Sequence, residues 1–463
     1  MLVVTLPLSA AKNPQRFAIN AKKAGADILE IRGDLTPNVA GFVSPLPLLI
    51  TPRGQGMRFI ERFKVTYLDL DQEEQLSLSK ISRSVKIILS IHHYEKTPAL
   101  KELKKTVQNM YSLKPWMVKF ATVTGNYNDV VALLNLQDLL NKKSIQSTVL
   151  GMGERSHILR ITSLIRNTFT YTFLDGTEPA APGQLPLSFY HLTKGRKKPK
   201  LFGIIGGKQI ASSLSPLIHN ALFQRHKIDA LYSCFPTENF KAAIKILAKI
   251  GVVGFSVTAP FKQEAFRLAK KHDAIVNSLG VANTLVKSGT GFHAFNTDVS
   301  GIESGYPELK KAKSIAILGA GGAVPSAILA IRHLNPKTHI TVFARDTKKA
   351  EAALQKFHVA IEPMRSAPAF GADAVLCAIS EDISLPIPKA QSSKLKSQSS
   401  LAIDLRYNKI TSFMRDAAKQ GYRVRDGIPM LISQALKQFE YFTGKKIFSD
   451  DAEYLRSILI THH

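Results

Sequence analysis

The chain has 463 residues, of which 45% are hydrophobic and 21% charged, enough for two or three domains with their own cores. It contains no run of about 18 uncharged apolar residues, which argues against a membrane-spanning helix. The formal net charge is +27, but Lys and Arg are dispersed, with no long basic tail and no nucleic-acid-binding motif. We therefore expect no nucleic-acid partner, although the charge would favour an anionic substrate or cofactor.

The N-terminus and the cysteines bear on location. Residues 1–7 read MLVVTLP, with no basic segment and no small-residue cleavage site, which predicts a first strand and not a signal peptide. The two cysteines, Cys234 and Cys377, lie far apart in the sequence, which excludes a disulfide framework or a cysteine zinc site. We expect a cytoplasmic protein without a metal site.

Up to about residue 190, short apolar runs alternate with amphipathic stretches. The runs predict eight strands, over residues 2–6, 28–31, 47–50, 66–70, 86–91, 116–121, 146–150 and 169–174. Several intervening stretches have helical spacing of apolar residues. This alternation predicts a (β/α)8 TIM barrel, with a doubly wound sheet as the competing architecture.

In such a barrel the reactive residues lie at the C-terminal ends of the strands. Polar side chains gather there: Glu30, Arg32, Arg53, Asp71, His92, His93 and Lys119. Lys119 lies inside an apolar strand, where burial would favour a neutral amine that can attack a carbonyl and form a Schiff base. A lysine that reaches water at the barrel rim is the alternative. His92 is suited to general base work, although a structural histidine also fits this place.

The pattern changes after residues 194–200, KGRKKPK, which predict an exposed basic linker. Further strands are expected over residues 201–205, 252–257, 315–318, 339–343, 374–378 and 401–404, and a helical tail over 429–442. This order predicts an α/β substrate domain followed by a Rossmann dinucleotide-binding domain. The expected parts are the barrel 1–193, the linker 194–200, the substrate domain 201–300, the Rossmann domain 301–425 and C-terminal helices 426–463 that return to the substrate domain.

A glycine turn connects an expected strand at 314–318 to an expected helix at 326–333. The turn consists of Gly319, Ala320, Gly321, Gly322 and Ala323. A strand, a glycine turn and a helix in that order place backbone N–H groups and a helix N-terminus where a dinucleotide pyrophosphate can bind. Val324 replaces the third glycine of the usual fingerprint, and glycine turns also occur for packing alone, so the motif by itself is weak.

From about residue 200 onward the chain resembles the shikimate dehydrogenase family. The resemblance is carried by segments 213–216 (SLSP), 256–262 (SVTAPFK), 281–284 (VANT) with 296–298 (NTD), 319–323 and 430–434 (MLISQ). It implies that Lys262 and Asp298 form a catalytic dyad. It also implies that the substrate is bound by Ser213, Ser215, Thr258, Asn283, Tyr407 and Gln434. The nicotinamide cofactor would be bound by the glycine turn with Ala344, Arg345, Lys348 and Gly427.

The residues after the expected strand 339–343 bear on the choice of cofactor. Arg345 can accommodate a 2′-phosphate, whereas NAD sites commonly place an acidic residue here. Asp346, directly adjacent, is the counter-signal, but NADP-type members of the family carry Asn-Arg-Thr at this place. We therefore expect NADP.

Residues 1–193 resemble, less tightly, the type I 3-dehydroquinate dehydratases, which are barrels with a Schiff-base lysine. The resemblance is carried by segments 29–32 (LEIR), 51–53 (TPR), 90–98 (SIHHYEKTP), 118–121 (VKFA) and 181–184 (APGQ), with Arg160. It implies that Lys119 forms the imine and that His92 moves the proton. The implied substrate-binding residues are Glu30, Arg32, Arg53, Arg160 and Gln184.

Four residues depart from these family patterns and bear on substrate affinity. Ser256 replaces Asn, Val299 replaces Gly, Ala180 replaces Ser and Asp71 replaces Glu. The expected function is a bifunctional enzyme that dehydrates 3-dehydroquinate and then reduces 3-dehydroshikimate with NADPH. The alternatives are quinate or shikimate oxidation with NAD, an inactive regulatory protein, and a nucleic-acid binder.

Overall fold

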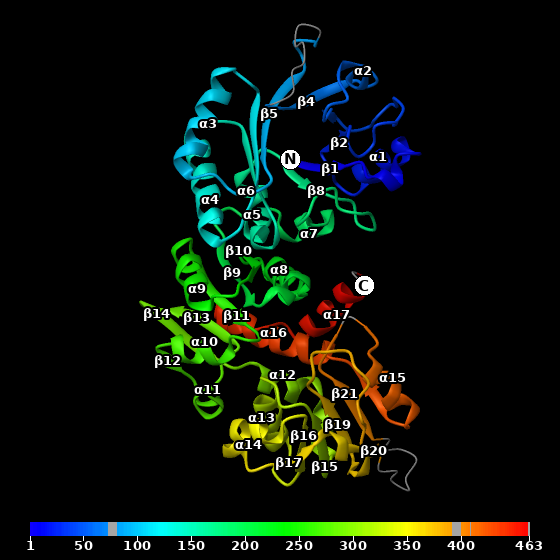
Figure 1. Ribbon diagram of the computed structural model, residues 1–463, viewed down its shortest axis with the longest axis vertical. Coiled ribbons are helices and arrows are strands. Elements are labelled where there is room, and N and C mark those ends of the chain that lie inside the picture. The colour runs from blue at the N-terminus through cyan, green and yellow to red at the C-terminus, as the bar shows by residue number, and fades with distance from the viewer. Residues whose placement is uncertain (73–80, 391–399, 408, 462–463) are drawn as a thin grey trace. The chain divides into compact units, whose positions relative to one another are not determined.

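A computed structural model describes residues 1–72, 81–390, 400–407 and 409–461 (Figure 1). The chain divides into two compact units, Met1–Val253 and Gly254–His463. Within the described ranges, no helix combines the length and the apolar character needed to cross a membrane.

The first unit contains eight parallel strands in the order β7-β6-β5-β4-β3-β2-β1-β8. They are β1 (Leu2–Thr5), β2 (Ile28–Arg32), β3 (Leu48–Thr51), β4 (Val65–Asp71), β5 (Lys86–His93), β6 (Met117–Val123), β7 (Ser147–Met152) and β8 (Thr170–Thr172). All eight predicted strands are confirmed. The doubly wound alternative is wrong, because β1 pairs with both β2 and β8 and the strands otherwise follow one another in sequence, without a switch point.

Side chains join the two ends of this sheet, between β7 and the residues that precede β8. The Asn167 amide accepts a hydrogen bond from the Val149 N–H at 3.3 Å and donates one to its carbonyl at 3.1 Å. The Thr148 hydroxyl accepts a hydrogen bond from the Phe169 N–H at 3.0 Å. An amide side chain carries both a donor and an acceptor, so it can stand in for a neighbouring strand and bring the barrel close to closure.

Helices follow most barrel strands, and Figure 1 shows α3 and α4 outside the sheet. The helices are α1 (Pro14–Lys23), α2 (Met57–Ile60), α3 (Leu100–Ser112), α4 (Tyr127–Lys142), α5 (His157–Ile161), α6 (Ser163–Arg166) and α7 (Leu187–Thr193). In α4 the residues Val130, Leu133 and Leu140 are buried on one face. The Asn126 side chain caps this helix by accepting from the N–H groups of Asn128 and Asp129.

The remainder of the first unit packs against the barrel. It comprises β9 (Lys200–Gly206), the 3-10 helix η4 (Lys208–Ser212), α8 (Ser215–Arg225), β10 (Ala230–Pro236) and α9 (Phe240–Lys249). β9 and β10 pair in parallel. The Tyr127 hydroxyl of α4 donates to the Pro236 carbonyl at 3.0 Å, so the barrel and β10 share buried polar contacts. β10 is a fully buried strand that the sequence did not lead us to expect.

A second contact joins the barrel helix α5 to β10. His157 Nδ1 lies 2.9 Å from the Ser233 hydroxyl and accepts a hydrogen bond from the Cys234 N–H at 3.4 Å. Because a backbone N–H can only donate, Nδ1 carries no proton and the imidazole is neutral. Burial lowers the pKa of His157 to about 4, which keeps this neutral form in place at physiological pH.

The second unit begins within β11 (Val252–Val257), which pairs antiparallel with β13. The following elements are α10 (Lys262–Leu268), β12 (Lys271–His272), α11 (Ala274–Leu279), β13 (Thr284–Ser288), β14 (Gly291–Phe295) and α12 (Asp298–Gly305). A six-stranded parallel sheet follows in the order β17-β16-β15-β19-β21-β22, which reverses direction at β15 and is the Rossmann arrangement.

The Rossmann part consists of the six strands of this sheet, a two-stranded sheet of β18 and β20, and the helices α13 to α15. They are β15 (Ser314–Leu318), α13 (Val324–Leu334), β16 (His339–Ala344), α14 (Thr347–Leu354), β17 (Ala360–Pro363), β18 (Gly371–Ala372), β19 (Ala374–Cys377), β20 (Lys389–Ala390), β21 (Leu401–Asp404), α15 (Ser412–Lys419) and β22 (Arg423–Arg425). The chain ends with α16 (Ile428–Thr443) and α17 (Asp451–Thr461). The predicted strands of this half and the helical tail at 429–442 are confirmed.

Two glycines let α12 and α16 approach closely. A Cβ at Gly301 would lie 2.9 Å from the Gln434 Cβ, and a Cβ at Gly305 would lie 2.9 Å from the Met430 nitrogen. Only a residue without a side chain fits at such distances. The close packing brings the N-terminus of α12, which begins at Asp298, beside α16.

Candidate active sites

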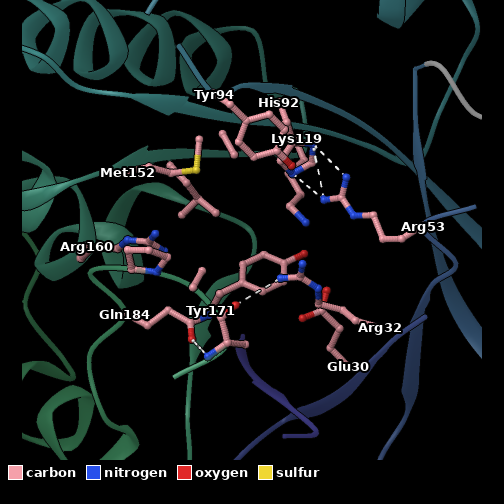
Figure 2. A pocket seen from close by; sticks show the side chains of 15 residues that line it. Glu30, Arg32, Arg53, His92, Tyr94, Lys119, Met152, Arg160, Tyr171 and Gln184 are labelled. Atoms are coloured by element: carbon pink, nitrogen blue, oxygen red, sulfur yellow. Dashed lines mark hydrogen bonds between the residues drawn. The ribbon is translucent and has the colours of Figure 1, made fainter. Parts of the chain in front are cut away.

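The first candidate site is a cavity of about 190 Å³ in the barrel, at the C-terminal ends of its strands (Figure 2). All seven residues that the sequence predicted for the first reaction line it: Glu30, Arg32, Arg53, His92, Lys119, Arg160 and Gln184. Figure 2 shows Lys119 pointing into the space between His92 and Tyr171. The barrel therefore brings together residues that are up to 154 positions apart, from Glu30 to Gln184.

Lys119 is buried on β6, with 5% of its surface exposed, so the alternative of a lysine that reaches water is wrong. Its Nζ lies 2.6 Å from the Asp69 Oδ2 on β4 and 4.5 Å from the ring centre of Tyr171 on β8. Burial disfavours the Asp69 carboxylate, but the Lys119 ammonium outweighs it and holds the pKa of that carboxyl below its usual value. Lys119 is thus fixed with its nitrogen inside the cavity.

His92 lies on β5 between an acid and a cation. Its Nδ1 lies 2.7 Å from the Asp71 Oδ2, and its Nε2 lies 2.8 Å from the Arg53 Nη2. The carboxylate can only accept and the guanidinium can only donate, so Nδ1 carries the proton and Nε2 holds the lone pair. Burial lowers the pKa of His92, the hydrogen bond that its Nδ1–H donates to Asp71 raises it, and the Lys119 and Arg53 cations lower it further. The net shift is downward, which favours a neutral imidazole with a basic Nε2.

The remaining polar residues of the cavity lie around Lys119 and His92. Arg160, which is 2% exposed, forms no ion pair with any residue in the described part of the chain, so its cation is available to an anionic ligand. Arg32, in contrast, is paired with Asp34 at 2.6 Å. The Gln184 amide oxygen accepts from the Ala180 N–H at 2.8 Å and holds the loop over the cavity. The Ala180 departure therefore leaves its backbone contacts intact.

Two residues of this site were missed from the sequence. Asp69 pairs with Lys119, and Tyr171 has a buried hydroxyl without a hydrogen-bond partner among the described residues. A signal for Asp69 existed, because strand alternation places Asp69 and Asp71 on the same face of β4. A buried acid in a strand requires a cation nearby. Tyr171 lies in a short run, TYT, that carries no such signal.

The second candidate site lies in the second unit and centres on an ion pair. The Lys262 Nζ at the start of α10 lies 2.6 Å from the Asp298 Oδ2 at the start of α12. The Asn283 amide donates to the other Asp298 oxygen at 2.8 Å and to the Thr297 hydroxyl at 2.9 Å. The Thr297 hydroxyl also donates to the Gln434 amide oxygen on α16 at 3.4 Å. Four predicted residues, Lys262, Asn283, Asp298 and Gln434, are therefore brought together.

Other predicted substrate residues lie elsewhere along the chain. Ser213 and Ser215 belong to the first unit, where the Ser213 hydroxyl accepts from the Ser215 N–H at 3.2 Å. Thr258 lies in the turn between β11 and α10, and its carbonyl accepts from the Phe261 N–H at 3.0 Å. Tyr407 is half-buried and follows β21.

A cavity of about 350 Å³ lies at the C-terminal ends of β15 and β16. Its lining includes five residues that were predicted to bind the cofactor: Gly319, Ala320, Gly321, Ala344 and Arg345. Gly319 has a φ of +102°, and a Cβ there would lie 2.9 Å from Ile379, so glycine is required at the turn. The turn leaves space beside backbone N–H groups, which is what a pyrophosphate needs.

The remaining residues that were predicted to bind the cofactor do not line this cavity in the described structure. They are Gly322, Ala323, Lys348 and Gly427, whereas Lys349 and Glu381, which were not predicted, do line it. Gly427 is required by packing, since a Cβ would lie 2.3 Å from the Leu405 carbonyl oxygen.

Asp346, the acidic residue that argues against NADP, caps a helix. Its carboxylate accepts from the Lys349 N–H at 3.0 Å and caps α14. The neighbouring Arg345 is largely exposed and lies 3.4 Å from Glu381, a contact too solvated to hold it strongly. The Arg345 guanidinium can therefore contact a phosphate.

The other departures have structural explanations. Val299 is buried in the core of the second unit beside Ile302. Asp71 reaches both His92 and Arg53, at 2.7 and 3.0 Å. Among the residues that the structure describes, no group of three or more His, Cys, Asp and Glu side chains is placed to hold a metal ion.

Two protein families match this chain. The model for type I 3-dehydroquinase matches residues 2–189, and the model for the shikimate dehydrogenase substrate binding domain matches residues 205–285.

Relatives are similar over long stretches. The bifunctional 3-dehydroquinate dehydratase/shikimate dehydrogenase of Arabidopsis thaliana, a chloroplastic protein, is 26% identical and covers 94% of this chain and 81% of its own. The NADP(+) shikimate dehydrogenase of Leptospira interrogans is 32% identical and covers 54% of this chain and 92% of its own. A crystal structure of shikimate dehydrogenase in complex with NADP+ is 26% identical, with a TM-score of 0.50, over 57% of this chain and 96% of its own.

Proposed function

Because this chain belongs to the shikimate dehydrogenase family and carries a type I 3-dehydroquinase domain ahead of it, we propose that it catalyses two consecutive reactions. The barrel dehydrates 3-dehydroquinate to 3-dehydroshikimate, and the second half reduces 3-dehydroshikimate to shikimate with NADPH. The single observation that carries the first reaction is the buried Lys119 beside His92 in one cavity. The observation that carries the second reaction is the ion pair between Lys262 and Asp298.

In the first reaction Lys119 is the nucleophile. Its Nζ adds to the ketone carbon of 3-dehydroquinate, and the ketone oxygen leaves as water to give an imine. The ammonium must first lose a proton, because it is paired with Asp69 at 2.6 Å. The imine makes the adjacent C–H acidic, since its nitrogen can take up the electron pair.

His92 moves the proton in this reaction. Its Nε2 removes the proton from the carbon next to the imine and then delivers a proton to the departing hydroxyl, which leaves as water. Asp71 holds the Nδ1 proton, which keeps the lone pair on Nε2. Hydrolysis of the imine then releases 3-dehydroshikimate and returns Lys119. The unpaired guanidinium of Arg160 is suited to the substrate carboxylate, with Gln184, Arg32 and Glu30 near the hydroxyls.

In the second reaction Lys262 donates a proton to the oxygen of the ketone as it becomes a hydroxyl. A fixed cation at this point stabilises the negative charge that develops on that oxygen. Asp298 holds Lys262 in place through their contact of 2.6 Å. We assign the orientation of the substrate ring to Ser213, Ser215, Thr258, Asn283, Tyr407 and Gln434.

The cofactor of the second reaction is NADP, whose reduced form, NADPH, would supply the hydride when bound. The turn at Gly319 fits a pyrophosphate because Gly319, Ala320 and Gly321 line a cavity of about 350 Å³ at the N-terminal side of α13, where backbone N–H groups favour an anion. Arg345 would contact the 2′-phosphate. We propose that four further residues flank the bound cofactor: Gly322, Ala323, Lys348 and Gly427.

A coupled assay tests both activities in one sample. With 3-dehydroquinate and NADPH, the wild-type protein should consume NADPH, and Lys119→Ala should not. The same variant should still consume NADPH when 3-dehydroshikimate is supplied directly. Borohydride added with 3-dehydroquinate should trap a covalent adduct at Lys119, detected by mass spectrometry. An adduct that still forms in Lys119→Ala would contradict the assignment of this lysine.

The cofactor preference can be measured separately. Steady-state kinetics should give a higher kcat/KM with NADPH than with NADH, because the Arg345 guanidinium matches a phosphate. Arg345→Asp should reverse this preference, while Arg365→Asp, an arginine that does not line the cavity, should leave it unchanged. A wild-type preference for NADH would contradict the proposal.

We also propose the domain limits and the location. The barrel ends at residue 193, the linker covers 194–200, the substrate domain 201–300, the Rossmann domain 301–425, and the helices from 426 return to the substrate domain. A cytoplasmic location is supported by the thiols of Cys234 and Cys377, which are buried and not joined in a disulfide. Its partners are the small-molecule substrates, with no nucleic acid and no membrane.

A further inference from the structure

A chain of buried hydrogen bonds leads from β11 to the ion pair of the second site. The Ser256 hydroxyl donates to the Gln438 amide oxygen at 2.7 Å. The Gln438 amide nitrogen donates to the Thr284 hydroxyl at 3.0 Å and to the Asn283 carbonyl at 3.4 Å. The Thr284 hydroxyl donates to the Asn283 side-chain oxygen at 2.8 Å, and the Asn283 amide nitrogen donates to Asp298. All five side chains are at most 6% exposed.

The donors and acceptors in this chain run in one direction. The Thr297 N–H can only donate and lies 2.8 Å from the Asn283 side-chain oxygen, so the Asn283 amide nitrogen faces Asp298. A Gln438 amide in the opposite orientation would place its oxygen against the Asn283 carbonyl, which is repulsive. The Ser256 hydroxyl, which can donate to the Gln438 oxygen, favours the observed orientation.

Gln438 therefore holds Asn283 at two points. It contacts the backbone carbonyl directly and reaches the side-chain oxygen through Thr284. Asn283 in turn occupies one oxygen of Asp298 and leaves the other to Lys262 at 2.6 Å. Because an error of about 1 Å in such a constellation can reduce a rate by as much as 10²-fold, the residues that hold it matter for the rate.

We propose that Gln438, together with Ser256, is a positioning residue for the reduction. The pair orients Asn283 and thereby aims the Asp298 carboxylate at Lys262. Serine at position 256, where the family usually has asparagine, is then one half of a local arrangement whose other half is Gln438 on α16. This inference rests on the proposed roles of Lys262 and Asp298.

Variants along the hydrogen-bond chain test the proposal. Gln438→Met and Thr284→Val keep the shape of each side chain and remove its hydrogen bonds. Each should lower kcat for 3-dehydroshikimate reduction by about 10-fold or more, with KM for NADPH unchanged. Thr284→Ser keeps the hydroxyl and should restore most of the rate. The double variant should be no slower than the slower single variant, because both changes break the same chain.

Controls separate positioning from stability. Gln420→Met makes the same chemical change at an exposed position of the second unit and should leave kcat unchanged. The dehydratase rate of each variant, measured on the same protein, reports the amount of folded first unit, and an unchanged KM for NADPH reports that the second unit is folded. If Gln438→Met does not fold, Ser256→Ala serves as the second variant. It removes the donor at the far end of the hydrogen-bond chain and should also lower kcat.

The outcomes distinguish this inference from the proposed function. If Asp298→Asn loses the reductase activity while Gln438→Met and Ser256→Ala stay within about 2-fold of wild type, Gln438 has no positioning role. Losses that multiply in the Gln438→Met, Thr284→Val double variant would also overturn it. If Asp298→Asn itself retains the wild-type rate, the proposed dyad fails.

Discussion

At the scale of single residues, the barrel site depends on opposite effects acting on one imidazole. Burial has the largest effect and disfavours the protonated form of His92, Asp71 stabilises that form, and Lys119 and Arg53 oppose it. Arg53 also occupies the Nε2 that must take a proton, at 2.8 Å. A substrate that draws the Arg53 guanidinium toward itself would expose this lone pair, so binding and activation of the base are linked in one side chain.

The pH dependence of dehydration follows from this arrangement. His92 must be neutral to accept a proton, so activity is lost as the pH falls through its pKa, which is below the ordinary value of 6.5. Arg53→Met removes a cation and should raise that pKa, so the acid limb of kcat/KM should move to higher pH. Arg58→Met, at an exposed position on α2, is the matched control. An acid limb that stays in place in Arg53→Met would contradict the assignment.

At the scale of elements, the approach of α12 to α16 positions the second site. Gly301 and Gly305 make it possible, and they place Gln434 within reach of Thr297. The same approach brings Gln438, one turn further along α16, to Thr284 on β13. Gln434, which we propose binds the substrate, and Gln438, which we propose positions Asn283, thus share one face of α16, and their register depends on Gly301 and Gly305 of α12.

Gly301→Ala should disturb this register. Its Cβ would lie 2.9 Å from the Gln434 Cβ and 3.2 Å from the Met430 oxygen, so the helices must separate. We expect a loss of about 1–3 kcal/mol in the free energy of unfolding and a clear fall in reductase kcat/KM. Ser304→Ala, at an exposed position of α12, should change neither quantity. Calorimetry and both enzyme assays on the full chain measure the effects, and an unchanged reductase would show that the helix spacing is not critical.

Regular elements were predictable, and long-range polar pairs were not. The eight barrel strands are short apolar runs with polar neighbours, and their periodicity sufficed. The helical spacing of Leu431, Ala435 and Phe442 places Gln438 on the buried face of α16, but it does not identify the groups that satisfy its amide. Its partner Ser256 is 182 positions away, and no local pattern couples them. For Asp69, strand alternation with Asp71 gave a signal for the residue itself, but its partner Lys119 is 50 positions away and no local pattern identifies it.

At the scale of the whole molecule, the first unit is more than a barrel. β9, β10 and their helices pack on it through Tyr127 and His157, so the first unit extends to Val253. The contact between His157 and β10 requires a neutral imidazole, because the Cys234 N–H donates to its Nδ1. The interface between the barrel and β10 should therefore weaken when this histidine becomes charged.

Acid should destabilise the first unit through His157. Its pKa is about 4 in the folded protein and about 6.5 in the unfolded chain, so the unfolded chain binds more protons between these values. The contribution is fully present above pH 6.5 and is lost as the pH falls toward 4, by up to about 3 kcal/mol. Urea unfolding of wild type and His157→Gln across this range measures it. The stability difference between the two proteins should change with pH, and a difference independent of pH would contradict this role.

The helix α5 connects the two sets of proposed substrate-binding residues within the first unit. It carries Arg160, which lines the barrel cavity, and His157, which contacts β10. Next on β10, Cys234 donates to the Ile210 carbonyl, and the same carbonyl accepts from the Ser213 N–H. In genetic terms, a mutated copy that lacks only one activity can be complemented by a second copy that lacks only the other activity. A mutation that displaces α5 would impair both steps, so neither kind of single-activity copy would complement it.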